Sequence, residues 1–215
     1  MLRRAILSGL FLCLASPLPA AAQDASPLQD LQSRYEALEG LRASFTQVTA
    51  SEFADDSSRI DGTVLLSKNK YRVETPTQTV VTNGTTTWIY APADSQVVVN
   101  DADAEASTLT PQTFLTTAPE KYDLASTRTT SRDNTPHEAL SLTAADASAR
   151  FEEATLWVRR ADRIVTRLRA VDRNGSILDL RLRDIQVDPR LNESAFSFAA
   201  PEGVEVVNLR TDSTE

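Results

Sequence analysis

Over most of the chain, apolar and polar residues alternate with a period of two, which predicts β-strands. The clearest case is 178–183, where leucines alternate strictly with charged residues. We predict ten or eleven short strands joined mainly by turns, at 41–48, 60–67, 70–75, 79–82, 86–90, 96–100, 122–130, 138–144, 153–160, 164–172 and 176–187, and a last extended stretch at 192–209.

The first segment with a helical period begins at Ser26-Pro27, where serine is a good N-cap and proline suits the first turn. We expect it to end at Gly40. Its apolar stripe has spacings of three and four residues and consists of Leu28, Leu31, Tyr35 and Leu38. Such a helix covers a sheet either as fixed packing or as a movable lid.

A second, shorter helix is predicted to begin at Thr110-Pro111 and to end at Pro119. It carries Phe114 and Leu115. Two helical segments and many strands indicate a mainly β protein, an unclosed antiparallel β-barrel or half-barrel. A sheet of that width encloses more volume than its own side chains fill, so we expect an apolar cavity with the helices as its lid.

Turn chemistry supports hairpins at several points. Asn83-Gly84 is predicted to form a two-residue turn with both residues at positive φ, and Asn174-Gly175 is a second hairpin turn. After the first turn, Trp88 and Tyr90 share one face of a strand. The single histidine, His137, follows Pro136 and is expected in an exposed loop.

Residues 1–22 have the pattern of a cleavable secretory signal: Arg3 and Arg4, then an apolar stretch, then three alanines. The remaining 23–215 are expected to form a single soluble domain. The one cysteine, Cys13, lies in the signal, so the mature chain relies on its hydrophobic core. A net charge of −8 without a basic run argues against nucleic acid as a partner.

No catalytic motif is present: the sequence lacks a nucleophile elbow, a zinc-binding H-E-x-x-H and a phosphate-binding glycine loop. The acidic stretch 101–105 lacks the glycine and the distal glutamate of a calcium loop, which favours a solvated loop. We therefore predict neither an enzyme nor a protein with a cofactor or metal.

Several segments, taken in order, resemble the periplasmic outer-membrane lipoprotein carrier proteins of the LolA type. They span nearly the whole mature chain: the first helix with Ala43-Ser44-Phe45-Thr46-Gln47, Gly62 to Lys68 with Tyr71-Arg72, Asn83-Gly84 with Trp88, Tyr90, Pro92 and Gln96-Val97, and Phe196 to Val204. The order and spacing of these segments carry the resemblance.

The resemblance implies a monomeric periplasmic carrier. It would bind the acyl chains of lipoproteins released by an ATP-driven inner-membrane complex and pass them to an outer-membrane receptor. It also implies an apolar cavity and lid formed by Leu31, Phe45, Leu65, Tyr71, Val73, Trp88, Tyr90, Phe114, Leu115 and Leu180. For each aromatic residue, ordinary core packing remains the alternative.

The chain departs from the family at one hairpin, where a basic residue is usually followed by proline. Here Lys68 stands in the place usually held by an arginine tied to cargo transfer, and the proline is absent. Lysine lacks the planar donor fork of arginine, so Arg72 is a second candidate for the basic role. Two other functions stay open: a periplasmic sensor domain that binds a membrane partner, and a carrier of another amphiphile such as a glycolipid.

Overall fold

The computed structural model describes residues 26–51, 54–102 and 109–210. The predicted signal, 1–22, and most of the acidic stretch 101–105 lie outside these ranges. No helix within them is both long and apolar enough to span a bilayer.

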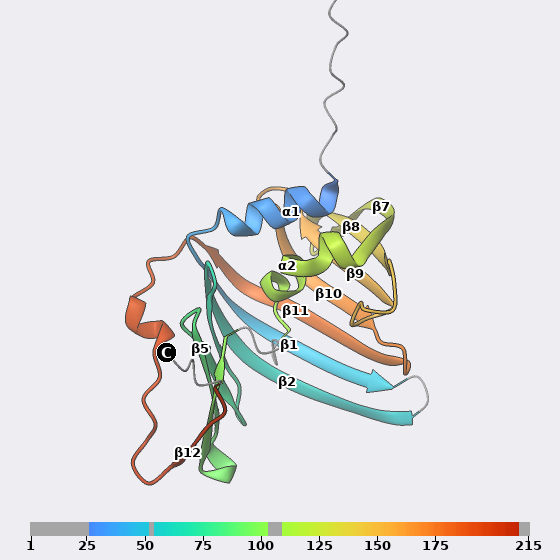
Figure 1. Ribbon diagram of the computed structural model, residues 1–215. Coiled ribbons are helices and arrows are strands. Elements are labelled where there is room, and N and C mark those ends of the chain that lie inside the picture. The colour runs from blue at the N-terminus through green and yellow to red at the C-terminus, as the bar shows by residue number, and fades with distance from the viewer. Residues whose placement is uncertain (1–25, 52–53, 103–108, 211–215) are drawn as a thin grey trace, which may run out of the picture.

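One sheet of twelve strands dominates the structure and curls around a concave face (Figure 1). Its order is β12-β6-β5-β4-β3-β2-β1-β11-β10-β9-β8-β7, with β12 and β7 as free edges. The strands are β1 Leu41–Ser51, β2 Ala54–Ser67, β3 Lys70–Glu74, β4 Thr79–Thr82, β5 Thr86–Ala91, β6 Gln96–Asp101, β7 Tyr122–Arg132, β8 Thr135–Ala144, β9 Glu153–Arg159, β10 Ile164–Val171, β11 Ser176–Val187 and β12 Glu205–Asn208. The mainly β fold and the unclosed sheet confirm the prediction.

Two α-helices, α1 (Pro27–Glu36) and α2 (Pro111–Lys121), lie over the concave face (Figure 1). Both start as predicted, with capping boxes at Ser26 and Thr110 that satisfy backbone N–H groups of the first turn. Single 3₁₀ turns follow β5 and β11, at η1 (Pro92–Asp94) and η2 (Glu193–Phe196).

The register places one apolar row on the concave face. Val64 pairs with Val73, Val73 with Val80, and Val80 with Ile89. Residues directly opposite in a ladder share a face, so this row runs across four strands. Together with the leucines of β11 and the helices, this face holds the main hydrophobic core.

The convex face of β3–β6 has a smaller core of its own. Val81 and Val97 are almost fully buried there, because the chain after β11 returns along this side (Figure 1). Phe196 is buried in η2, and the Phe198 ring lies 5.6 Å from that of Tyr90. The sheet is therefore covered on both faces in this region.

Several local predictions were wrong. The first helix ends at Glu36, with Ala37 as its C-cap, rather than at Gly40. The second helix continues past Pro119 to Lys121, because a proline in the last turn removes only one backbone hydrogen bond. β12 pairs in parallel with β6, which makes the sheet mixed rather than wholly antiparallel.

At the Asn83-Gly84 turn, Gly84 has a φ of 92° but Asn83 is not among the residues with positive φ. Asn83 acts through its side chain instead, since its Oδ1 accepts hydrogen bonds from the backbone N–H groups of Thr85 and Thr86. His137 lies in β8 and is 4% exposed, with its ring bonded to Thr135 O and Thr166 Oγ1. The strand begins at Thr135, three residues before its predicted start at 138, so Pro136 lies inside β8 and does not mark a loop.

Candidate functional site: an apolar cavity beneath two helices

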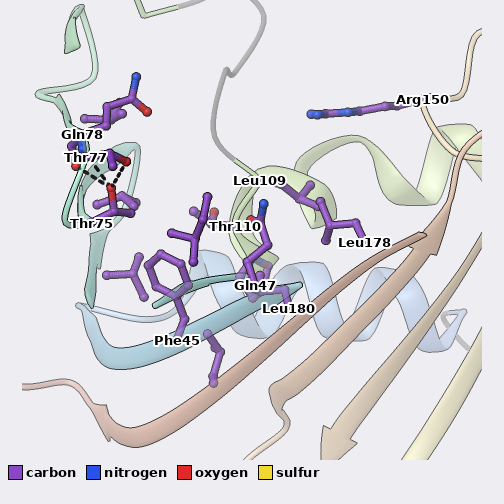
Figure 2. A pocket seen from close by; sticks show the side chains of 16 residues that line it. Phe45, Gln47, Thr75, Thr77, Gln78, Leu109, Thr110, Arg150, Leu178 and Leu180 are labelled. Atoms are coloured by element: carbon purple, nitrogen blue, oxygen red, sulfur yellow. Dashed lines mark hydrogen bonds between the residues drawn. The ribbon is translucent and has the colours of Figure 1, made fainter. Parts of the chain in front are cut away.

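A cavity of about 170 Å³ lies between the concave face of the sheet and the start of α2 (Figure 2). It is lined by Phe45, Gln47, Ile60, Val64, Val73, Thr75, Thr77, Gln78, Val80, Leu109, Thr110, Pro111, Arg150, Leu178, Leu180 and Leu182. The strand residues of the lining are apolar except for Gln47 on β1, and further polar side chains come from the turn between β3 and β4 and from Arg150. Pockets of this kind, apolar with a few polar groups, are typical of ligand sites.

The floor of the cavity results from the two-residue period of β1 and β11. Phe45 pairs with Leu182, and Gln47 with Leu180, so every second residue of both strands faces the lid. The ring of Phe45 lies over Gly62 on β2: a Cβ at Gly62 would come within 2.7 Å of the Phe45 ring and would also collide with the Glu74 carbonyl. Gly62 thus makes room for the largest side chain of the floor.

The mouth of the cavity carries polar side chains. On one side, the turn between β3 and β4 is closed by Thr75, whose Oγ1 donates to Gln78 O at 3.0 Å and accepts from Gln78 N at 3.0 Å. On the other side, Arg150 extends from the loop between β8 and β9 toward the opening (Figure 2). Its long side chain crosses from that loop to the rim.

Helix α1 closes the concave face with a fully apolar stripe. Leu28, Leu31 and Tyr35 are each at most 3% exposed. Tyr35 Oη accepts a hydrogen bond from Val165 N at 3.1 Å, and burial raises the pKa of this phenol. On the outer side, Arg34 Nε donates to Asp162 O at 3.0 Å.

Helix α2 lies beside α1 and reaches the cavity with its first turn. Phe114, Leu115 and Ala118 are buried, and the Phe114 ring lies 5.2 Å from the ring of Tyr122. A side-chain bond joins the two helices, from Gln32 Nε2 to Thr116 O at 3.3 Å. Further polar bonds tie the helices to the sheet and its turns, from Arg34, Tyr35 and Gln112. The rest of the contact is apolar and can be exchanged for other apolar contacts.

Comparison with protein families gives a match over residues 36–199 to the model of the outer membrane lipoprotein carrier protein LolA. The chain belongs to this family. Among curated relatives named outer-membrane lipoprotein carrier protein, that of Aliivibrio salmonicida is 28% identical over 209 residues, covering 94% of this chain and 98% of the relative. That of Halorhodospira halophila is 26% identical and covers 99% and 98%.

One solved structure shares the fold. An uncharacterised conserved protein from Thermus thermophilus superposes with a TM-score of 0.57 at 15% identity, covering 84% of this chain and 98% of that chain. A LolA superfamily protein from Nitrosomonas europaea gives a TM-score of 0.45 at 17% identity, covering 80% and 97%. At 15% identity, the likeness to the Thermus thermophilus protein concerns the fold alone.

The structure separates the residues that the LolA resemblance grouped together. Phe45, Val73 and Leu180 line the cavity. Tyr71 lies on the same face, half-buried against the main core. The three predicted lid residues lie on the helices, as Leu31, Phe114 and Leu115.

Leu65, Trp88 and Tyr90 lie on the other face, which corrects the expectation that they line the cavity. Trp88 neighbours Ile89, which faces the lid, so Trp88 and Tyr90 point outward with the second core. Alternation correctly predicted that these two aromatics share a face. It could not predict which face, because the returning C-terminal segment makes both faces apolar.

Neither Lys68 nor Arg72, the two basic candidates for cargo transfer at the hairpin of β2 and β3, lines the cavity. Lys68 is exposed at the two-residue turn between β2 and β3, with a φ of 55°, and its carbonyl accepts from Gln112 Nε2 of α2. It borders a second hollow of about 330 Å³ between the two helices and this turn. Arg72 is on the outer face, where it donates to Glu74 Oε1 at 2.8 Å and Ala195 O at 3.3 Å.

Sequence reasoning missed Val64, Val80, Leu178, Leu182 and Arg150 as lining residues. The four apolar residues carried a usable signal, since each lies an even number of positions from a named cavity residue or faces one across a ladder. Arg150 lies in a loop, where no alternation in the sequence could indicate that it lines the cavity. Among the described residues no group of three or more His, Cys, Asp or Glu side chains could hold a metal ion.

Proposed function

We propose that this protein is a periplasmic carrier that binds the acyl chains of lipoproteins released from the inner membrane and delivers them to the outer membrane. Family membership supports the carrier role. The observation that carries the proposal is the apolar cavity on the concave face, closed by two helices that rest on it through exchangeable apolar contacts.

The cavity in this conformation is too small for a whole acyl chain. At about 170 Å³ it is near the size of an engineered cavity of roughly 150 Å³ that admits benzene. Cargo binding therefore requires α1 and α2 to move away from the sheet. Their buried leucines cover the concave face in the empty protein and would cover acyl chains in the loaded one.

The energetics favour such an exchange. Burial of an acyl chain yields about 0.8 kcal/mol per methylene, so long chains held against water alone would bind almost irreversibly. Closure of the empty lid offsets part of this gain, because it buries the same leucines. Release into another apolar environment is then close to neutral in free energy.

The proposed partners follow from this role: acylated lipoproteins, an ATP-driven release complex in the inner membrane and a receptor in the outer membrane. The carrier works as a monomer, without catalysis or a cofactor. The exposed turn at Lys68, which touches α2, is the candidate contact for the handover step.

The test uses the mature chain from Gln23, mixed with a fluorescent triacylated peptide or with the same peptide lacking lipid, and analysed by gel filtration. We expect only the lipidated peptide to elute with the protein as a soluble complex. Elution of neither peptide with the protein would overturn the carrier proposal and favour a sensor domain of the same fold. Binding of a glycolipid but not of the lipopeptide would assign a different cargo.

A further inference from the structure

The cavity has one charged side chain in its lining, which binding of an acyl chain alone does not require. Arg150 is the one charged side chain among the described residues that line it. The other polar groups of the lining, on Gln47 of the floor and on Thr75 and Gln78 of the mouth, are uncharged. Arg150 extends toward them from the opposite side of the opening (Figure 2).

The loop that carries Arg150 is fixed on both sides of this residue. Ala149 and Phe151 are each 5% exposed, and Phe151 N donates to Tyr122 Oη at 3.1 Å. The guanidinium carbon of Arg150 lies 5.2 Å from the centre of the Phe151 ring. The cation is thus held against an aromatic ring next to the cavity, while its side chain stays exposed to solvent.

Among the described residues, the charged groups around this loop give Arg150 no ion-pair partner. Asp146 is engaged within the loop, where its carboxylate accepts from Ser148 N at 2.7 Å. Lys121 donates to Ser148 Oγ, and Arg173 donates to Asp146 O. In the described part of the chain, the guanidinium of Arg150 makes no hydrogen bond or ion pair, and two further cations lie near it.

We propose that Arg150 binds an oxyanion at the polar end of an amphiphile whose acyl chain lies in the cavity. The inference rests on the proposed carrier function and adds a charge preference to it. The guanidinium offers parallel donors that match a carboxylate or phosphate. Gln78 across the opening and Gln47 in the floor supply neutral donors to the same cavity. The preferred ligands are anionic amphiphiles over neutral ones of equal chain length.

The experiment compares hexadecanoate with hexadecanamide as competitors of a neutral fluorescent acyl probe, below the concentration at which either aggregates. We expect the wild-type protein to bind hexadecanoate about three- to tenfold more tightly, in line with a half-exposed charge-assisted contact. Arg150→Gln should bind both equally, and Arg150→Lys should keep part of the preference. Arg190→Gln, which removes the same charge at an exposed position outside the lining, is the matched control and should behave as wild type.

A second pair of probes decides the source of the oxyanion. Lipopeptides with aspartate or asparagine beside the acylated residue are compared on the same two proteins. An aspartate preference lost in Arg150→Gln places the oxyanion on the peptide of the cargo. If the protein prefers hexadecanoate over hexadecanamide but does not distinguish the two lipopeptides, the oxyanion is a lipid carboxylate.

The results separate this inference from the carrier proposal. If wild type binds every acyl probe but ignores charge, or if Arg150→Gln keeps the full preference, the role of Arg150 is refuted and the carrier stands. If wild type binds no acyl probe at all, the carrier proposal fails first. Added salt should weaken the preference, since the contact is exposed.

Discussion

The hydroxyl oxygen of Tyr35 accepts a hydrogen bond from the backbone N–H of Val165, 3.1 Å away. This contact ties α1 to β10, where the ladder with β9 shifts register between Val165 and Arg167. Both partners are buried, so the bond satisfies a backbone donor that water does not reach. It is the buried polar bond of a lid that apolar contacts and two more exposed bonds, from Arg34 and Gln112, also hold in place.

Tyr35→Phe should destabilise the closed protein by about 1–3 kcal/mol, because the Val165 N–H is left buried without an acceptor. Chemical denaturation measures the change in the free energy of unfolding. Tyr71→Phe is the control: Tyr71 is half-buried, and its hydroxyl makes no hydrogen bond within the described residues. Equal stability of the two variants would contradict a fastening role for Tyr35.

Leu31→Ala should lower the free energy of unfolding of the empty protein by about 2–5 kcal/mol, since this side chain is 0% exposed. Because the weakened lid competes less well with cargo, uptake of the triacylated peptide should not fall in parallel. Leu209→Ala, at a position that is 63% exposed, should change stability by less than about 0.5 kcal/mol. Unchanged stability and uptake in Leu31→Ala would refute the lid.

Val73→Phe places an aromatic ring in the cavity, where Val73 is a lining residue. The ring should exclude roughly two methylenes of a bound acyl chain and so weaken acyl binding about tenfold. Trp88→Phe alters the opposite face of the same region and should leave acyl binding unchanged. Titration with the fluorescent acyl probe measures both. A larger loss from the Trp88 variant would mean that cargo does not occupy the concave face.

Stability at low pH should depend on Asp179. Burial alone would raise the pKa of this carboxyl, but hydrogen bonds from Arg167 and Arg181 outweigh burial and hold the pKa at about 2. The unfolded value is about 3.9, so the stabilising contribution is complete above about pH 4 and is lost as the pH falls through about 2.

Asp179→Asn should therefore cost about 1 kcal/mol near pH 7, after allowance for solvent screening, and flatten the fall in stability between pH 4 and pH 2. Denaturation midpoints across this pH range measure the effect. Asp94→Asn, at an exposed position of η1, should track the wild type. A curve for Asp179→Asn that runs parallel to wild type would contradict the assignment.

Periodicity predicted most of the fold because the alternation of apolar and polar residues in each strand can be recognised within a few consecutive residues. The strands at 41–48 and 176–187 were found from their alternation and form the floor of the cavity. The strand predicted at 60–67 begins earlier, because β2 also includes the polar residues 55–58. A polar strand pairs through its backbone and needs no apolar face. Composition alone does not reveal such pairing.

The site was less predictable than the fold. Which face of a strand lines the cavity depends on segments that are distant in the sequence and cover one face or the other. Trp88 and Tyr90 point away from the cavity because the chain near Phe198 returns along the convex side. Arg150 lies at the mouth only because β8 and β9 bring its loop beside α2. Both relationships join parts of the chain separated by dozens of residues, beyond the reach of local patterns.

The sheet ends in two edges, β7 and β12, that no backbone ladder joins. In a closed barrel, strand number and stagger fix the diameter, and widening would break hydrogen bonds. Here the edges can separate while every existing pair of strands stays intact. The width of the concave face is thus not fixed by strand pairing. If the protein is the carrier proposed above, the same fold could hold acylated cargoes that differ in bulk.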